Sequence, residues 1–301
     1  TKTSIEKAKF LFKLYGKENL FEQIEWVEAD INDIPSLEIA FKGVEYVYHC
    51  AALISFDPKD EKKLRKINIE GTANIVNFCL EFNVKKLCHV SSIAALGDLM
   101  EHETLITEET ICNPEKHHSD YAISKYGAEM EIWRGLQEGL PVVIINPGVI
   151  LGPGFWDSGS GLLFTKIKNG LLFYTKGSSG FVSVNDVVKI MIQLIKKNSS
   201  GERYIVIAKN ISFENVLNCI AKGLDVKPPS IYAHPWITEI SWRIDWILST
   251  LFFQKRKISK SMARSLHTSD LISNEKITQI LDYKFKDIEE YCSEIGSYMN
   301  N

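Results

Sequence analysis

A tyrosine and a lysine, Tyr121 and Lys125, lie four residues apart in a segment with a helical pattern. In a helix this spacing places both side chains on one face. A phenol has an ordinary pKa of about 10, and a neighbouring ammonium stabilises the phenolate and lowers that pKa. Tyr121 can then give a proton to a carbonyl oxygen while a hydride reaches the carbonyl carbon. The pair alone is weak evidence, because most YxxxK pairs are a buried ring with a surface lysine.

Two hydroxyl residues, Ser91 and Ser92, end an apolar strand-like run at residues 87–90 (LCHV). The carboxyl ends of strands are where α/β proteins collect their site residues. At such a position Ser92 can hydrogen-bond a substrate oxygen and hold it beside Tyr121. Without the tyrosine and lysine, a simple strand cap would explain the serines as well.

The elements that must position these residues alternate between strand-like and helical patterns from residue 24 to residue 208. This alternation is typical of a parallel sheet with crossover helices. The expected strands are residues 24–28, 46–50, 87–91, 142–146 and 204–207, and helical patterns begin near residues 35, 72, 120 and 186. Glycine and proline crowd residues 147–161, where the chain leaves the sheet. Residues 209–301 are expected to be helical, without strands.

The composition of the 301-residue chain, with 45% apolar and 24% charged residues, is that of a globular protein. A net charge of -3 gives no basis for nucleic-acid binding. The six cysteines form no CxxC pair, so we expect reduced thiols and no metal site. No signal peptide opens the chain, and charged residues interrupt the most apolar stretch, residues 236–253. We therefore expect a cytoplasmic protein without an integral membrane segment.

Six motifs follow one another along the chain: residues 29–33 (ADIND), 49–52 (HCAA), 68–72 (NIEGT), 90–92 (VSS) with 121–125 (YAISK), 146–153 (NPGVILGP) and 181–186 (FVSVND). In this order they resemble the extended short-chain dehydrogenase/reductases. The resemblance implies an α/β fold with a Rossmann-type doubly wound parallel sheet and a smaller, mostly helical substrate lobe. It assigns residues 1–150 and 181–208 to the dinucleotide-binding domain, and residues 151–180 and 209–301 to the substrate lobe.

The same resemblance implies the role of each site residue. The expected catalytic residues are Ser92, Tyr121, Lys125 and Asn68, the last of which holds the sheet and the active site together. The residues expected beside NADP or NAD are Asp30, Ile31, Cys50, Ala51, Ala52, Ser91, Tyr121, Lys125, Pro147, Gly148 and Val149. The residues expected to border the substrate are Ser55, Phe56, Ala94 and Phe155. Asn146 departs from the family pattern, which usually has an arginine there.

Three functions remain open on these residues. The first is a carbonyl reductase or alcohol dehydrogenase, the second an NDP-sugar epimerase, and the third a non-catalytic cofactor-sensing module. Ser92 is followed by Ile93, not by the acidic pair of the sugar dehydratases, and residues 177–180 (GSSG) lack the arginine with which epimerases clamp a diphosphate. These departures favour a small or lipophilic carbonyl substrate and the branch similar to dihydroflavonol-4-reductase and 3β-hydroxysteroid dehydrogenase.

The resemblance carries three further expectations. NADP is slightly favoured over NAD, and a homodimer is expected through the helices at residues 72–81 and 121–138, with Met130 and Trp133 as apolar anchors. The GxxGxxG turn of the family, which holds the pyrophosphate, does not occur in the sequence. We therefore expect roughly 30 further residues upstream, carrying the first two strands.

The apolar stretch at residues 242–253 is interpreted as core or as a lid over a hydrophobic substrate, resting against a membrane surface.

Overall fold

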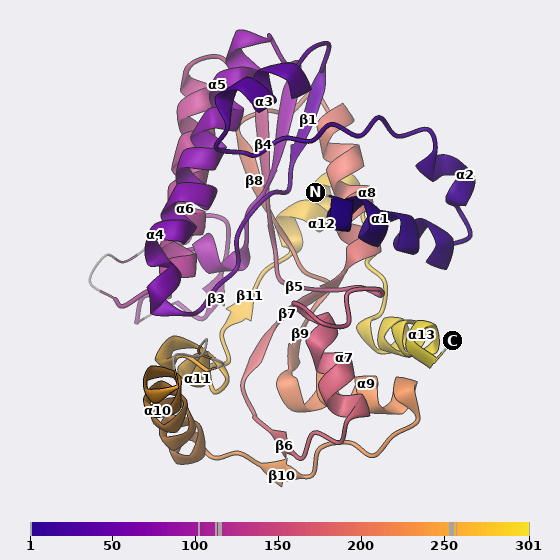
Figure 1. Cartoon of the computed structure of the whole chain (residues 1–301). Coiled ribbons are helices and arrows are strands. Elements are labelled where there is room, and N and C mark those ends of the chain that lie inside the picture. Colours follow the sequence, from indigo (N-terminus) through magenta and orange to yellow (C-terminus); the bar gives the residue numbers. More distant parts are fainter. Residues whose placement is uncertain are drawn as a thin grey trace.

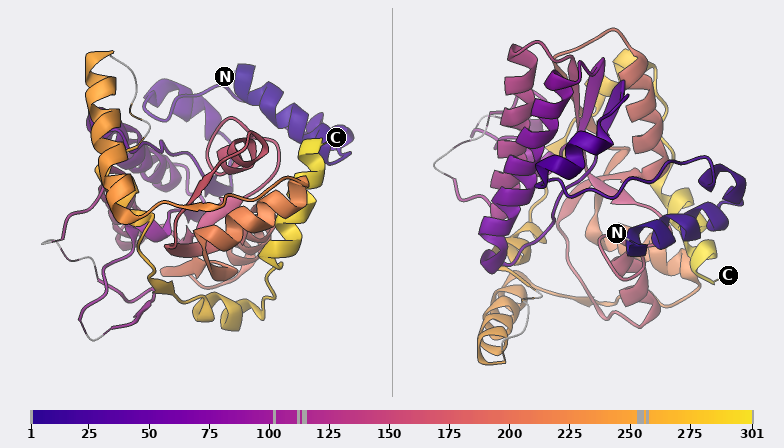
Figure 2. Two further views of the ribbon diagram at one scale, coloured as in Figure 1. Left: turned by 90° about the horizontal axis from the view of Figure 1, so that it is seen from below. Right: turned by 45° about the horizontal axis from the view of Figure 1, so that its top comes forward.

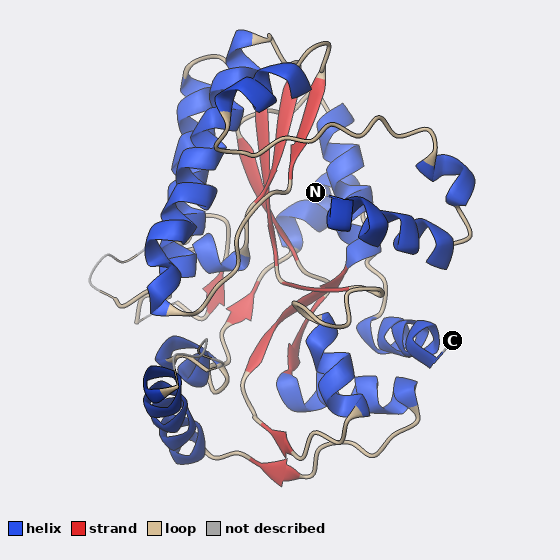
Figure 3. Ribbon diagram, in the orientation of Figure 1, coloured by secondary structure: helices blue, strands red, loops and turns tan. Residues whose placement is uncertain are grey.

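The computed structural model describes residues 2–101, 103–111, 113, 116–252, 256 and 258–300. Its main sheet has four parallel strands in the order β1 (Tyr46–His49), β2 (Lys86–Val90), β4 (Val142–Pro147) and β8 (Glu202–Val206). Figure 3 shows these strands side by side with helices on both faces. Four of the five expected strands are therefore confirmed, each within two residues of its expected ends, and they form the parallel α/β sheet that the alternating pattern predicted.

Alternate residues of β4 form the core on the two faces of this sheet. Val142 and Ile144 pack with helices α3 (Ile34–Ala40), α5 (Gly71–Glu81) and α6 (Asp120–Gln137). Val143 and Ile145 pack with α8 (Val184–Lys196) and α12 (Glu275–Leu281) on the other face (Figure 1). A strand buried on both faces needs a continuous apolar sequence, and VVII supplies it.

A second, smaller lobe lies at the carboxyl end of the main sheet. Its three-stranded sheet has the order β5 (Val149–Leu151), β7 (Ser178–Ser183) and β9 (Lys209–Ser212), and it packs against α7 (Gly161–Lys168), α9 (Phe213–Leu224) and α13 (Ile288–Asn300). Gly148 joins the two sheets at a close approach, because a Cβ on it would lie 2.2 Å from the Gly180 carbonyl oxygen.

Two further sheets have two parallel strands each. One pairs β3 (Leu105–Ile106) with β11 (Leu271–Ile272), and the other pairs β6 (Phe173–Tyr174) with β10 (Ile231–Tyr232). The expectation that residues 209–301 contain no strands is therefore wrong, since β9, β10 and β11 all lie there. Each has only two to four residues and pairs with a strand distant in sequence, so no local alternation announces it. The remaining helices of this region are α10 (Pro235–Leu251) and α11 (Lys260–Ser265).

The first thirty residues depart most from expectation. The chain opens with two helices, α1 (Lys2–Leu14) and α2 (Glu18–Phe21), but residues 24–28, expected to be a strand, form none. Ile24, Trp26 and Val27 are exposed instead. A β-branched run becomes a strand only beside a partner, and none of the described strands pairs with these residues. On this side the main sheet ends at β1, where Tyr46 and Tyr48 are 48% and 41% exposed.

Short helical turns connect β1 to α6. They are η1 (Pro58–Asp60), α4 (Glu61–Leu64), a π-helical turn η2 (Arg65–Glu70) that runs directly into α5, and η3 (Ile93–Ala95) after β2. Asn68, the one buried residue of the π-helical turn, points toward α6. π-helical turns are rare and frequently mark functional sites.

Candidate active site

The three expected catalytic side chains lie where β2 ends beside the first turns of α6. The side chain of Ser119 caps α6 by accepting a hydrogen bond from the Ala122 N–H at 3.1 Å, so the helix starts just before Tyr121. The Ser92 hydroxyl accepts from the Ala94 N–H at 3.1 Å and lies close enough to the Tyr121 phenol to lower its pKa. The structure thus places Ser92 near Tyr121, on the helix that also carries Lys125.

Tyr121 keeps its proton more firmly than the sequence predicts. Burial raises the pKa of the phenol, and the hydrogen bond with Ser92 only partly opposes this effect. Lys125 is not among the groups that shift this pKa, because its Nζ points to the Val90 carbonyl oxygen and donates to it at 2.9 Å. The action of the ammonium on the phenolate therefore stays a prediction.

Lys125 is almost completely buried, with 2% of its surface exposed. Desolvation lowers the pKa of its ammonium to about 8, while Glu129 and Cys50 act in the opposite direction. Among the described residues the ammonium donates one hydrogen bond, to Val90, although it has three protons to donate. It therefore has donors left for a ligand hydroxyl.

A buried carboxylate, Glu129, lies one helical turn beyond Lys125 and was not predicted. It accepts hydrogen bonds from the Ser91 hydroxyl at 2.5 Å and from Asn146 Nδ2 at 2.6 Å, and Arg203 lies 3.4 Å away. Burial raises the pKa of this carboxyl, and these three partners lower it again. Ser91, expected beside the cofactor, thus directs its hydroxyl into this network instead. Spacing was the available signal, because Glu129 continues the inward stripe of Tyr121 and Lys125 at i+4.

Asn68 connects three elements, in line with its expected holding role. Its Nδ2 donates to the Leu53 carbonyl oxygen and to the Ser124 hydroxyl, both at 2.9 Å, and its Oδ1 accepts from the Leu53 N–H at 2.7 Å. Ser124 in turn donates to the Tyr121 carbonyl oxygen at 2.8 Å. The loop after β1 is thereby fixed to the helix that carries the tyrosine. Asn68 itself touches none of the reacting groups.

Two buried histidines, His49 and His89, lie beneath this loop with ring centroids 4.9 Å apart. His49 is hydrogen-bonded to the Thr72 hydroxyl at 2.9 Å, and burial lowers its pKa to about 4. Burial and the Lys125 charge also lower the pKa of His89. Both imidazoles are therefore neutral at pH 7 and add no charge beside the lysine.

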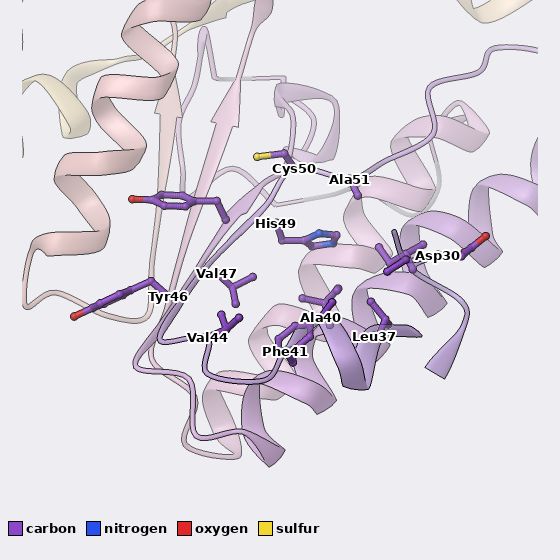
Figure 4. Close-up of a pocket in the computed structure, with 14 residues that line it drawn as sticks. Asp30, Leu37, Ala40, Phe41, Val44, Tyr46, Val47, His49, Cys50 and Ala51 are labelled. Atoms are coloured by element: carbon purple, nitrogen blue, oxygen red, sulfur yellow. The ribbon is translucent and has the colours of Figure 1, made fainter. Parts of the chain in front are cut away.

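A pocket of about 660 Å³ opens on the outer edge of β1 and is lined by Asp30, Ile31, Cys50 and Ala51, four of the residues expected beside the cofactor (Figure 4). Their placement depends on local contacts: Asp30 Oδ1 accepts from the Asn32 N–H at 2.9 Å, and Asn74 Nδ2 donates to the Ile31 carbonyl oxygen at 3.1 Å. The pocket does not include Tyr121 or Ser92. Most of its lining is apolar and comes from α3, β1 and α5, including Leu37, Phe41, Val47 and Ile75.

The other expected site residues differ in how close they lie to Tyr121. Phe56 lies edge-to-face with the Tyr121 ring at 5.8 Å, and Ser55 donates to Asp60 Oδ2 at 2.7 Å in the same loop. Ala94 adjoins Ser92 in η3. Phe155 lies instead under the ammonium of Lys7 in α1, at 5.6 Å. Ala52 is exposed in the loop after β1, and Pro147, Gly148 and Val149 form the link from β4 to β5.

These residues fit the nicotinamide and ribose half of a dinucleotide. The fit rests on the unused donors of Lys125, on the small side chains of Ala51 and Ala52 at the carboxyl end of β1, and on the pocket that continues from Cys50 to Asp30. No glycine-rich turn that could hold the pyrophosphate occurs in the sequence. No cluster of metal-binding side chains occurs among the described residues either.

Comparison with known proteins agrees with a dinucleotide site. The family model described as the NAD dependent epimerase/dehydratase family matches residues 6–208. Sterol demethylase protein B of Methylococcus capsulatus is 28% identical over 237 residues, covering 77% of this chain and 71% of that protein. A putative dihydroflavonol 4-reductase of Synechocystis is 27% identical over 238 residues, covering 76% and 68%. The crystal structure of UDP-glucose 4-epimerase from Thermotoga maritima superposes with a TM-score of 0.72 at 19% identity, covering 91% and 83%, which shows a shared fold.

The buried ammonium predicts a pH-dependent change in stability for Lys125→Met. The folded pKa of about 8 is below the unfolded value of 10.5, so the unfolded chain binds more protons between these values and stability rises with pH across this window. Below pH 8 the variant, which buries no charge, should therefore be more stable than the parent by about 1–3 kcal/mol. Urea unfolding at pH 7 and pH 10 measures the difference. A variant that is less stable at pH 7 would contradict the desolvation argument.

Proposed function

Because the chain belongs to the NAD dependent epimerase/dehydratase family, we propose that this NAD(P)-dependent enzyme interconverts a carbonyl and a secondary alcohol on a small or lipophilic substrate. The observation that carries the proposal is that Ser92, at the end of β2, lies near the buried Tyr121 phenol on the helix that also carries the buried Lys125. A protonated phenol beside a second hydroxyl is suited to receiving a carbonyl oxygen.

In the proposed reduction, the substrate carbonyl oxygen accepts hydrogen bonds from Ser92 and Tyr121. The Tyr121 phenol gives its proton to this oxygen as the carbonyl carbon is reduced, and the same phenolate takes the proton back in the oxidation direction. Lys125, with its unused donors, holds a ribose hydroxyl and stabilises the phenolate once it forms. When bound, the nicotinamide cofactor supplies or accepts the hydride. The lean toward NADP over NAD rests on the family resemblance alone.

The preference for a substrate without a diphosphate has a structural argument. Gly177 opens the GSSG segment in which epimerases carry an arginine, and it packs against the backbone of residues 266–268. A Cβ at this glycine would lie 2.4 Å from the Leu266 carbonyl oxygen, so no side chain fits there without a backbone shift. The names of two relatives, sterol demethylase protein B and a putative dihydroflavonol 4-reductase, refer to a sterol and to a dihydroflavonol.

Tyr121→Phe tests the proposal directly. The substitution removes the proton donor and leaves the ring packed against Phe56, so turnover of an apolar ketone should fall roughly 100-fold or more while cofactor affinity changes little. NADPH and NADH oxidation with a panel of apolar ketones measures turnover, and fluorescence titration measures cofactor affinity. Tyr126→Phe, on the same helix but 38% exposed, is the matched control. Full activity in the Tyr121 variant would refute the proposed chemistry. Conversion of UDP-glucose but of no ketone would favour the epimerase.

Glu129→Gln tests the buried carboxylate as a positioning residue. Glu129 raises the pKa of the Lys125 ammonium, so its neutral replacement should lower that pKa further. If the charged ammonium is required, the alkaline limb of the kcat/KM profile moves from near pH 8 to lower pH, while the value at pH 6 changes little. Glu131→Gln, on the same helix with its carboxylate paired to Arg134, should leave the profile unchanged. Identical profiles for parent and Glu129 variant would contradict the electrostatic role.

We also propose a homodimer through the exposed side of α5 and α6. The two helices pack together on one face of the main sheet, and Tyr126 and Met130 are 38% and 39% exposed on α6. Trp133 is partly buried against the sheet core, which leaves Met130 as the better anchor. Light scattering at micromolar concentration should give twice the chain mass, and Met130→Glu should shift the protein to the monomer. A monomeric parent would overturn this proposal.

A further inference from the structure

Helix α10 lies at the edge of the smaller lobe, at the periphery of the molecule in Figure 1 and in both views of Figure 2. Ser249 is its one buried residue. Large apolar side chains on this helix are between 48% and 66% exposed: Trp236, Ile240, Ile244, Ile247, Leu248 and Leu251. Of the two interpretations given for residues 242–253, core or a lid, the core interpretation is therefore wrong for the described residues. This is the densest group of exposed large apolar side chains in any described helix.

Trp246 is also exposed, at 53%, but lies on another side of the helix. The six residues named above form one stripe. They recur at intervals of three and four residues, which places them on one side of the helix, and at a rise of about 1.5 Å per residue the stripe is about 22 Å long. The opposite side attaches the helix to the lobe. There Asp245 Oδ2 accepts from the Ile258 N–H at 3.2 Å, and the Thr238 hydroxyl is hydrogen-bonded to His267 Nε2 at 2.9 Å. The stripe consequently faces away from the body of the protein.

The chain around the stripe is strongly basic. Residues 246–269 contain no Asp or Glu, although the whole chain has a net charge of -3. They contain five cationic residues: Lys255, Arg256, Lys257, Lys260 and Arg264, of which Lys255 and Lys257 lie outside the described residues. Arg243, on the flank of the stripe, lies 2.6 Å from Glu239, and Arg264 lies 3.6 Å from the same carboxylate. The carboxylate of Glu239 therefore faces two arginines at this edge of the molecule.

We propose that α10 lies on the surface of a lipid bilayer that contains anionic headgroups. An apolar stripe with tryptophan, flanked by lysine and arginine, is the composition of a helix that rests in the headgroup region. At 17 residues with three charges α10 lies on the bilayer and does not cross it, and none of the described helices is both long and apolar enough to cross one.

Charge argues against a second copy of the chain as the occupant. A twofold interface brings the same surface of both subunits together, so Arg243, Arg264 and Lys260 would approach their own symmetry mates. Like charges brought together in an interface oppose association. An anionic lipid surface instead pairs with all of them.

Co-sedimentation of the full chain with lipid vesicles tests this surface. Vesicles of phosphatidylcholine with phosphatidylserine should bind the protein roughly tenfold or more better than vesicles of phosphatidylcholine alone, and added salt should reduce the difference. The triple variant Ile240→Ser, Ile244→Ser and Leu248→Ser should lose roughly tenfold or more of this binding. Because all three side chains are exposed, its thermal midpoint should match that of the parent.

A matched control removes equally exposed apolar side chains elsewhere. Ile39→Ser, Ile111→Ser and Leu172→Ser replace residues that are 62%, 75% and 57% exposed outside α10, and this variant should bind vesicles as the parent does. Equal loss of binding in both triple variants would overturn the assignment to α10, as would a parent that binds neither vesicle. A parent that dimerises through α10, becomes monomeric in the α10 variant and ignores vesicles would replace the bilayer by a second copy of the chain.

Discussion

The buried ammonium of Lys125 is the constraint on which the arrangement of the site depends. A cation removed from water is costly unless charged or hydrogen-bonding groups compensate it. Glu129, one turn along α6, supplies the charge, and it must itself be satisfied by donors. These donors come from the ends or bodies of three strands: Ser91 after β2, Asn146 in β4 and Arg203 in β8. One buried lysine thereby fixes the register between a helix and most of the main sheet.

The network extends beyond the carboxylate to the small β3 region. Arg203 donates through Nε to the Glu108 carbonyl oxygen at 2.7 Å, and Glu108 Oε1 accepts from the Ile205 N–H at 2.8 Å. Glu108 thus connects β8 of the main sheet to the loop that precedes α6. Buried polar networks of this kind stabilise one arrangement because any member left unpaired would cost free energy. Tyr121 is held by the same network, because Tyr121 and Glu129 lie on one helix, α6.

Local signals in the sequence were enough to place Tyr121, Lys125 and Ser92 and to predict four strands. Tyr121 and Lys125 share a helix face by spacing alone, and Ser92 follows a strand whose apolar run is continuous. Partners distant in sequence were harder: Arg203 sits in β8 with no local sign that it faces a carboxylate. The run at residues 24–28 has strand composition but lacks a partner strand, and a strand is defined by its partner. The sequence of α10 shows a helical period of apolar residues. It does not show that these residues are exposed, because that depends on which other elements pack against the helix.

The open side of β1 has a consequence for the growth of the main sheet. Among the described strands only β2 pairs with β1, so the other edge of β1 presents backbone donors and acceptors between the exposed rings of Tyr46 and Tyr48. Such an edge can accept a further strand through backbone hydrogen bonds. Leu37, Phe41 and Ile75 line the pocket beside this edge, so an added strand with alternating apolar residues would continue the core on that face of the sheet.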